Sequence, residues 1–234
     1  MTTDRILLIS NSTLYRRAYL DHVADRIQSM FAAARRIVFV PYALFDREAY
    51  GKKAEQRFRE LGLDLSSLHR TEDPRAAVAA CDGIFIGGGN TFRLLDSLYR
   101  HNLLELIRDR VRAGVPYVGS SAGSIVAGPT IMTTKDMPIV QPPSFASLHL
   151  VNFQISPHYL DPDPSSTHMG ETQQDRILQF LEENDRTVIG LREGSFLECG
   201  ERSAVLGGPF SARVFRRDRE IVEVPPQTDL GQFV

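Results

Sequence analysis

The chain has little of what metal, redox and membrane proteins depend on. It contains no tryptophan and only two cysteines, Cys81 and Cys199, which lie far apart in the sequence and form no Cys-x-x-Cys pair. This usage argues against a metal or redox centre. No apolar run approaches the roughly 18 residues that a membrane span needs, and no leader of the secretory type precedes the first apolar run. We therefore expect a cytoplasmic protein with no metal and no membrane partner.

The chain also lacks an excess of charge of either sign. Its 27 basic residues nearly balance its 29 acidic ones, which leaves a formal net charge of -2. A nucleic-acid-binding protein commonly shows a strongly basic balance, so we expect no nucleic-acid partner. The 234 residues, 42% of them apolar, suit one α/β domain with a single core. We expect residues 1–234 to form that domain.

In the first half of the chain, continuous apolar runs alternate with segments of helical periodicity. The predicted strands are residues 5–10, 37–40, 63–68, 83–86 and 115–118. The predicted helices are residues 14–34, 50–61, a short one from Asp73, one after Asn90, and 103–113. Such alternation predicts a parallel sheet covered on both faces, with ligands bound at the carboxyl ends of the strands.

The pattern changes beyond residue 124. Residues 130–140 and 148–155 are predicted to be extended with no helix between them, so the sheet is expected to become mixed. A helix at 170–183 and a strand at 187–191 follow. The remaining apolar runs are short and favour antiparallel strands.

The pattern Gly119-x-Ser121-x-Gly123 follows the strand at 115–118. It matches a nucleophile elbow, in which a sharp glycine-flanked turn presents a serine hydroxyl above the sheet. An ordinary glycine-rich turn between strand and helix is the alternative, because the pattern also arises by chance. Ser121 is the candidate nucleophile on the first interpretation.

A serine nucleophile needs a base, and the chain has six histidines. His158 is favoured because it follows Pro157 at the end of a predicted strand, where a side chain can overhang the site. The other candidates are His22, His69, His101, His149 and His168. The separations of the three later histidines, His149, His158 and His168, fit no zinc site. Two carboxylates compete to orient the base, Asp136 and Glu193, and spacing alone leaves both open.

The turn at Gly87-Gly88-Gly89 also has two interpretations. It lacks the third glycine of the dinucleotide fingerprint, so no nucleotide cofactor is expected. Exposed backbone N–H groups in such a turn suit an oxyanion hole, whose other half is the amide of Ala122, directly after the candidate nucleophile.

Several motifs together resemble the S51 family of serine peptidases, the α-aspartyl dipeptidase family. They are Gly-Gly-Gly-Asn-Thr-Phe (87–92), Ser-Ala-Gly (121–123), Thr-Thr-x-Asp-Met-Pro-Ile-Val (133–140), Pro-His (157–158), Gly-Glu-Thr (170–172), Gly-Leu-x-Glu-Gly (190–194) and Leu-Gly-Gly-Pro (206–209). Residues 10–13, Ser-Asn-Ser-Thr, also look similar, so the resemblance covers essentially the whole chain.

The resemblance implies a flavodoxin-like, class I glutamine amidotransferase-like three-layer sandwich, with a mainly parallel sheet and antiparallel C-terminal strands. It also implies a Ser-His-Glu triad, which falls on Ser121, His158 and Glu193. Asp136 matches an aspartate associated with activity in the family and stays as the rival third member. Gly88 and Ala122 match the oxyanion-hole positions.

Two residues depart from the family pattern. Ser120 stands where members often carry tryptophan, and Gln173 stands where they commonly carry arginine after Gly-Glu-Thr. A neutral amide cannot give a substrate carboxylate the charged bidentate partner that arginine gives. Arg176 and Arg192 are candidate replacements, and Asn90 is a further substrate-binding candidate.

The predicted function is hydrolysis of dipeptides with a free N-terminal aspartate through an acyl-enzyme, by a monomer or homodimer. Two alternatives remain. One is a cyanophycinase-like or other aspartyl-amide hydrolase of the same fold. The other is a non-catalytic flavodoxin-like binding module that kept the turn without the chemistry. A glutamine amidotransferase is disfavoured, because that chemistry uses a cysteine at the elbow.

Overall fold

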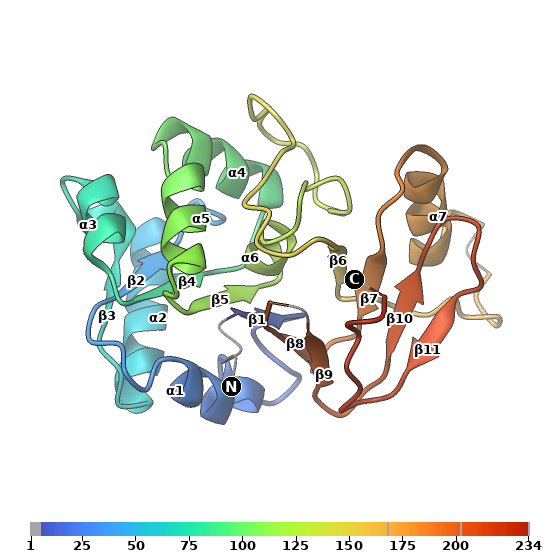
Figure 1. Cartoon of the computed structure of the whole chain (residues 1–234), viewed down its shortest axis with the longest axis horizontal. Coiled ribbons are helices and arrows are strands. Elements are labelled where there is room, and N and C mark those ends of the chain that lie inside the picture. Colours follow the sequence, from blue (N-terminus) through green and yellow to red (C-terminus); the bar gives the residue numbers. More distant parts are fainter. Residues whose placement is uncertain (1–5, 168, 202, 234) are drawn as a thin grey trace.

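Two sheets lie side by side in the computed structural model, which describes residues 6–167, 169–201 and 203–233 (Figure 1). The seven-stranded large sheet has the order β3-β2-β4-β5-β1-β8-β9, and the four-stranded small sheet has the order β11-β10-β7-β6. Large-sheet strands are β1 (Ile6–Ile9), β2 (Ile37–Val40), β3 (Leu65–Ser67), β4 (Gly83–Ile86), β5 (Tyr117–Ser120), β8 (Phe196–Cys199) and β9 (Ala204–Gly207).

Five neighbouring strands of the large sheet, β3, β2, β4, β5 and β1, are parallel, whereas β8 and β9 add to its edge in antiparallel register. Every residue of β1, β2, β4 and β5 is buried, which explains why the sequence shows continuous apolar runs in these strands rather than alternation. The carboxyl ends of β1, β4 and β5 therefore meet at one edge of the sheet, where both glycine-rich turns begin.

Helices cover both faces of the large sheet (Figure 1). Alternate strand residues face opposite ways: Leu8 and Ile86 join the core that includes α3 (Pro74–Ala80), α4 (Thr91–Arg100), α5 (Leu104–Arg112) and α6 (Ala122–Ile125). Leu7 and Phe85 join the core on the other face, beneath α1 (Ala24–Met30) and α2 (Arg47–Glu60). Two short 3₁₀ segments, η1 (Asp21–Val23) and η2 (Leu68–Arg70), complete this part.

The small sheet is built from the second half of the chain and carries its own helix. Its strands are β6 (Gln154–Pro157), β7 (Val188–Leu191), β10 (Ala212–Phe215) and β11 (Val222–Val224). Strands β6 and β7 are parallel and are joined through α7 (Gln173–Glu183). Ile177 and Leu181 of α7 pack with Val188 and Phe215 of the sheet in a third, smaller core.

The predicted fold class is confirmed, but several predicted elements differ in extent. The helix expected at 14–34 forms only as η1 and α1, because Leu20 adopts a left-handed backbone conformation (φ 57°) and interrupts it. The strand expected at 130–140 is absent from the described structure, in which this segment is a loop with one isolated bridge, Thr130 to Ala146. The single mixed sheet expected is two sheets.

Among the described residues, no helix combines the length and the apolar character that crossing a bilayer would require.

Candidate active site

Ser121 lies at a strained turn between β5 and α6. Its φ of 51° and ψ of -109° are unusual for a residue with a side chain, as expected of a nucleophile elbow. The flanking glycines are required sterically: a Cβ on Gly119 would lie 2.5 Å from the Gly123 carbonyl oxygen, and one on Gly123 would collide with the Ile86 carbonyl oxygen. The turn therefore presents the Ser121 hydroxyl at the carboxyl edge of the large sheet.

His158 approaches Ser121 from the small sheet. It follows β6 directly, and its Nε2 lies 2.9 Å from Ser121 Oγ. The His158 backbone also has a positive φ, 52°. Its N–H donates to Ser10 Oγ at 2.9 Å, and the Ser10 hydroxyl donates in turn to the Leu191 carbonyl at 2.8 Å. One hydroxyl after β1 thus ties the ends of β6 and β7 to the large sheet.

Glu193 contacts the other ring nitrogen of His158. Its Oε1 lies 2.6 Å from His158 Nδ1, a distance typical of a charge-assisted hydrogen bond. Glu193 follows β7, and since β6 and β7 are parallel neighbours with Pro157 opposite Leu191, their carboxyl ends meet. Gly194, the residue after Glu193, is also fixed in place, because its N–H donates to Asn11 Oδ1 at 2.8 Å.

Asp136 lies in the same cleft but contacts different groups. Its Oδ2 accepts from the Thr91 N–H at 2.7 Å, from the Thr91 hydroxyl at 2.6 Å and from the Thr134 hydroxyl at 3.1 Å. Asp136 thereby binds the first residue of α4 and fixes the loop after Thr133. The carboxylate that contacts the His158 ring is Glu193.

The two proposed oxyanion-hole residues flank Ser121. A Cβ on Gly88 would lie 3.1 Å from Ser121 Cβ, so its backbone passes directly beside the hydroxyl. Ala122 is the first residue of α6, where the N–H has no partner within the helix. Burial raises the pKa of the Tyr50 phenol, partly offset by hydrogen bonds from Tyr19 and the Gly88 backbone.

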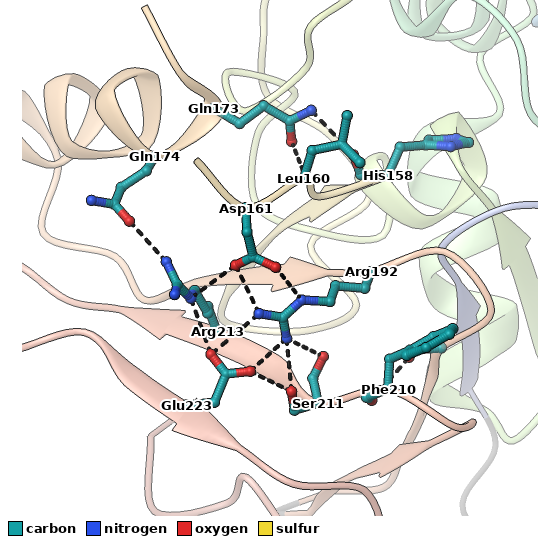
Figure 2. A network of polar contacts seen from close by, with 11 residues as sticks. His158, Leu160, Asp161, Gln173, Gln174, Arg192, Phe210, Ser211, Arg213 and Glu223 are labelled. Atoms are coloured by element: carbon teal, nitrogen blue, oxygen red, sulfur yellow. Dashed lines mark hydrogen bonds and ion pairs between the residues drawn. The ribbon is translucent and has the colours of Figure 1, made fainter. Parts of the chain in front are cut away.

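Gln173, a predicted substrate-binding residue, is bound to the backbone of residues 158 and 160. Its Oε1 accepts from the Leu160 N–H at 3.1 Å, and its Nε2 donates to the His158 carbonyl at 3.2 Å (Figure 2). The Gln173 Oε1 also accepts from Lys135 Nζ at 3.0 Å. Lys135 Nζ also donates to the Pro157 carbonyl at 2.6 Å. Burial lowers the pKa of Lys135 to about 8. Both side chains are thus committed to holding the segment that carries His158.

Arg192 is committed to an ion-pair network (Figure 2). Its guanidinium contacts Asp161 at 2.8 Å and Glu223 at 2.6 Å, and Arg213 contacts the same two carboxylates at 3.2 and 3.0 Å. Burial raises the pKa of Glu223, but hydrogen bonds from Arg192, Ser211 and Arg213 outweigh this and lower it to about 2.

The other two substrate-binding candidates also have protein partners. Arg176 pairs loosely with Glu171 at 3.7 Å, on an exposed surface. Asn90 is the N-cap of α4: its Oδ1 accepts from the Arg93 N–H at 3.0 Å, and its Nδ2 donates to the Met137 carbonyl at 2.9 Å. Neither Arg176 nor Asn90 is among the described residues that line the cleft over Ser121.

A cleft of about 720 Å³ opens over Ser121. Its walls come from the first turn after β1, the N-terminal half of α2, the triple-glycine turn and the two catalytic candidates. The residues that line it are Ser12, Tyr19, Leu44, Phe45, Asp46, Ala49, Tyr50, Lys53, Gly88, Gly89, Ser121, Asp136 and His158. Sequence reasoning missed Lys53, because the only signal was a helical spacing within a segment rich in charged residues.

The remaining histidines lie elsewhere. His69 contacts Ser67 and Glu48, His101 ends α4 and stacks on Tyr42, and His149 contacts Asn152. His22 belongs to η1, where burial lowers its pKa. His168 falls outside the described residues. Within the described part of the chain, no group of three or more His, Cys, Asp or Glu residues is placed to hold a metal ion.

Several known proteins are similar to this chain in sequence or in fold. Peptidase E of Streptomyces coelicolor is 49% identical over 229 residues, covering 98% of this chain and 94% of that protein. A Drosophila melanogaster protein named "Probable alpha-aspartyl dipeptidase" is 42% identical, covering 96% and 95%. The crystal structure of a peptidase from an acI-B1 Actinobacterium shares the fold, with a TM-score of 0.70 at 16% identity over 96% of this chain and 95% of that one.

The model of the family described as "Peptidase family S51" matches residues 6–207. This match covers the parallel half of the large sheet, the elbow, and the segments that carry His158 and Glu193. It agrees with the motifs found along the sequence, and we conclude that the chain belongs to peptidase family S51.

Proposed function

We propose that the protein is a serine dipeptidase that hydrolyses dipeptides with a free N-terminal aspartate. The observation that carries the proposal is the continuous chain from Ser121 Oγ to His158 Nε2 at 2.9 Å and from His158 Nδ1 to Glu193 at 2.6 Å. Relatives named peptidase E and α-aspartyl dipeptidase support the substrate class. We further propose that it acts in the cytoplasm as a monomer or homodimer.

In the proposed mechanism, His158 Nε2 removes the proton of Ser121 Oγ as that oxygen attacks the carbonyl carbon of the aspartyl residue. Glu193 accepts a hydrogen bond from His158 Nδ1–H, which sets the tautomer of the ring and stabilises the imidazolium. The Gly88 and Ala122 amides stabilise the tetrahedral oxyanion. His158 then protonates the leaving amine, which departs and leaves an aspartyl ester on Ser121.

Hydrolysis of the ester repeats these steps with water as the nucleophile. His158 removes a proton from water, the hydroxide attacks the ester carbonyl, and the imidazolium returns the proton to Ser121 Oγ. Free aspartate is released and the serine is regenerated.

The test offers the purified protein Asp-, Glu- and Asn-initiated dipeptides, with and without N-terminal blocking groups, in the presence of a chelator. We expect turnover only of unblocked Asp-X, and a loss on the order of 10⁶ in kcat for Ser121→Ala, as in other serine triads. Ser124→Ala is the matched control, since its hydroxyl is bound to the Ile9 and Gly119 carbonyls.

The possible outcomes separate the alternatives. Full activity in Ser121→Ala would overturn the nucleophile assignment. Cleavage of blocked or polymeric aspartyl amides in preference to Asp-X would favour the cyanophycinase-like alternative. No turnover by the wild type would favour a binding module.

A further inference from the structure

A dipeptide that begins with aspartate brings two carboxylates into the cleft, and the arginines suggested by the sequence do not line it. Arg192 is bound by Asp161 and Glu223, and Arg176 lies on the surface beside Glu171. Of the described residues that line the cleft, Lys53 is the only lysine or arginine. Lys53, on α2, is therefore the cation that could bind a substrate carboxylate in this cleft.

The position of Lys53 follows from the geometry of α2. Asp46, Ala49, Tyr50 and Lys53 are spaced at i, i+3, i+4 and i+7, so they share one face of the helix. All four line the cleft. Tyr50 is buried and packs against Phe39 of the large sheet with ring centroids 5.0 Å apart, which fixes this face relative to the sheet. Lys53 lies on the same face, about one turn beyond Tyr50 along α2.

The ammonium of Lys53 is held but not neutralised. It lies 4.5 Å from the centroid of the Tyr19 ring, and the Tyr19 side chain also lines the cleft. A cation–π contact orients an ammonium without consuming its capacity to donate hydrogen bonds to an anion. Among the described residues, no carboxylate lies within ion-pair distance of Lys53, whereas the neighbouring Lys52 pairs with Glu48 at 3.3 Å.

Asp46 and Asp136, the two carboxylates among the described cleft residues, form no ion pair with Lys53. Asp46 caps α2 and accepts from the Ala49 N–H at 2.9 Å, and Asp136 accepts from Thr91 and Thr134. Both are therefore committed to the protein's own N–H and O–H groups. We propose that Lys53 binds a carboxylate of the substrate and is a specificity determinant of this enzyme. The inference rests on the proposed function.

The experiment compares the wild type with Lys53→Met, Lys53→Arg and Lys52→Met on Asp-Leu and on Asp-Leu amide. Loss of one charge-assisted contact in a solvated cleft is expected to lower kcat/KM for Asp-Leu about tenfold, mainly through KM. Lys53→Arg retains the charge and is expected to recover most of the loss. Lys52→Met, which removes an exposed ion pair on another face of α2, is expected to match the wild type.

Salt provides a readout that a purely structural role would not change. The KM of the wild type for Asp-Leu is expected to rise with ionic strength, and that of Lys53→Met to change less, because the screened attraction is already missing. Asp-Leu amide shows which of the two substrate carboxylates Lys53 binds, because it lacks the C-terminal one. The loss of kcat/KM caused by Lys53→Met persists with Asp-Leu amide if Lys53 binds the aspartyl side chain. It disappears if Lys53 binds the C-terminal carboxylate.

The outcomes that overturn the inference are distinct from those that overturn the proposed function. Equal kcat/KM for Lys53→Met and Lys52→Met, in an active wild-type background, rejects the role of Lys53 alone. An equal salt dependence of the wild type and Lys53→Met, or no recovery by Lys53→Arg, also rejects it. A wild type that does not cleave Asp-Leu rejects the proposed function, and this inference with it.

Discussion

Two residues with side chains adopt positive φ angles where Ser121 meets His158. Conformations of this kind cost on the order of 1–3 kcal/mol each and persist only where surrounding contacts impose them. The Ser121 N–H donates to the Ile9 carbonyl at 2.9 Å, and the His158 N–H donates to the Ser10 hydroxyl. Both strained residues are thus held by two consecutive residues at the end of β1.

The different surroundings of Glu193 and Asp136 lead to a prediction that separates their roles. Glu193→Gln removes the anion beside His158 Nδ1 and allows the wrong ring tautomer, so kcat is expected to fall about 10⁴-fold with little change in stability. Asp136→Asn replaces an acceptor of three hydrogen bonds by an amide. We expect it to lower the free energy of unfolding by about 1–3 kcal/mol. Steady-state kinetics and urea denaturation measure the two effects.

A larger fall in kcat for Asp136→Asn than for Glu193→Gln, in variants that remain folded, would contradict our triad assignment.

Sequence patterns alone suggested part of the site. The glycines around Ser121 and the Pro-His pair at a strand end are local signals, and both residues lie in the site. The choice of Glu193 depended on the family resemblance, because spacing does not reveal that β6 and β7 are parallel neighbours whose ends meet. Lys53 and the ion pairs of Arg192 depend on contacts between distant segments, which periodicity cannot encode.

At the scale of elements, buried strands and capped helices were the most predictable. Asp73 and Asn90 cap α3 and α4 as their positions indicated. Residues 130–140 were predicted to be extended. In the structure they form a loop held by side chains instead of a strand ladder, with Thr133 bonded to the Ile155 carbonyl. Local sequence could not show that the partners of this loop are Thr91 and β6.

The network of Arg192, Arg213, Asp161 and Glu223 joins four elements of the small sheet. Asp161 lies shortly after β6, Arg192 follows β7, and Arg213 and Glu223 belong to β10 and β11. Because Arg192 immediately precedes Glu193, the network holds the backbone that presents the proposed acid. Through Asp161, the network also fixes the chain three residues after His158.

Glu223→Gln is expected to destabilise the protein by about 1 kcal/mol near neutral pH, since the network is partly exposed. The folded-state pKa of Glu223 is depressed to about 2 from 4.5. A depressed carboxyl pKa stabilises the fold above the unfolded-state value, and the contribution is lost as pH falls through the folded-state value. The stability difference between wild type and Glu223→Gln should therefore shrink from pH 4.5 to about 2.

Denaturant unfolding at a series of pH values measures this difference. Glu171→Gln is the control and should show little effect: it removes the charge of the exposed 3.7 Å pair with Arg176, and its amide oxygen can still accept from Gln179. A difference for Glu223→Gln that stays constant across the window would contradict an ionised network.

At the scale of the whole molecule, the division into two sheets was not predictable. The C-terminal strands were correctly predicted as antiparallel β-structure, yet β8 and β9 extend the large sheet while β10 and β11 join the small one. These strands resemble one another in length and composition. Which edge each strand joins depends on long-range packing, and the chain crosses between the sheets at Gly194 and Ser195.

We expect residues 1–234 to unfold as one domain despite the two sheets. The chain runs from the large sheet into the small one, returns for β8 and β9, and ends in the small sheet with β10 and β11. Ser10, directly after β1, also contacts His158 and Leu191 at the ends of β6 and β7, so we expect that neither sheet opens without breaking contacts of the other. Calorimetric and van't Hoff enthalpies of unfolding should agree, and tyrosine fluorescence and far-ultraviolet circular dichroism should give coincident transitions. Two resolved transitions would instead indicate two independently stable units.

The supply of the site's residues from both sheets has a consequence for biosynthesis. Ser121 completes the parallel half of the large sheet, whereas His158 and Glu193 belong to segments that a ribosome makes later, at about 5–20 residues per second. A nascent chain that has folded only as far as the elbow would carry an unactivated serine. Peptidase activity should therefore first appear when translation has passed β7 and the small sheet can form.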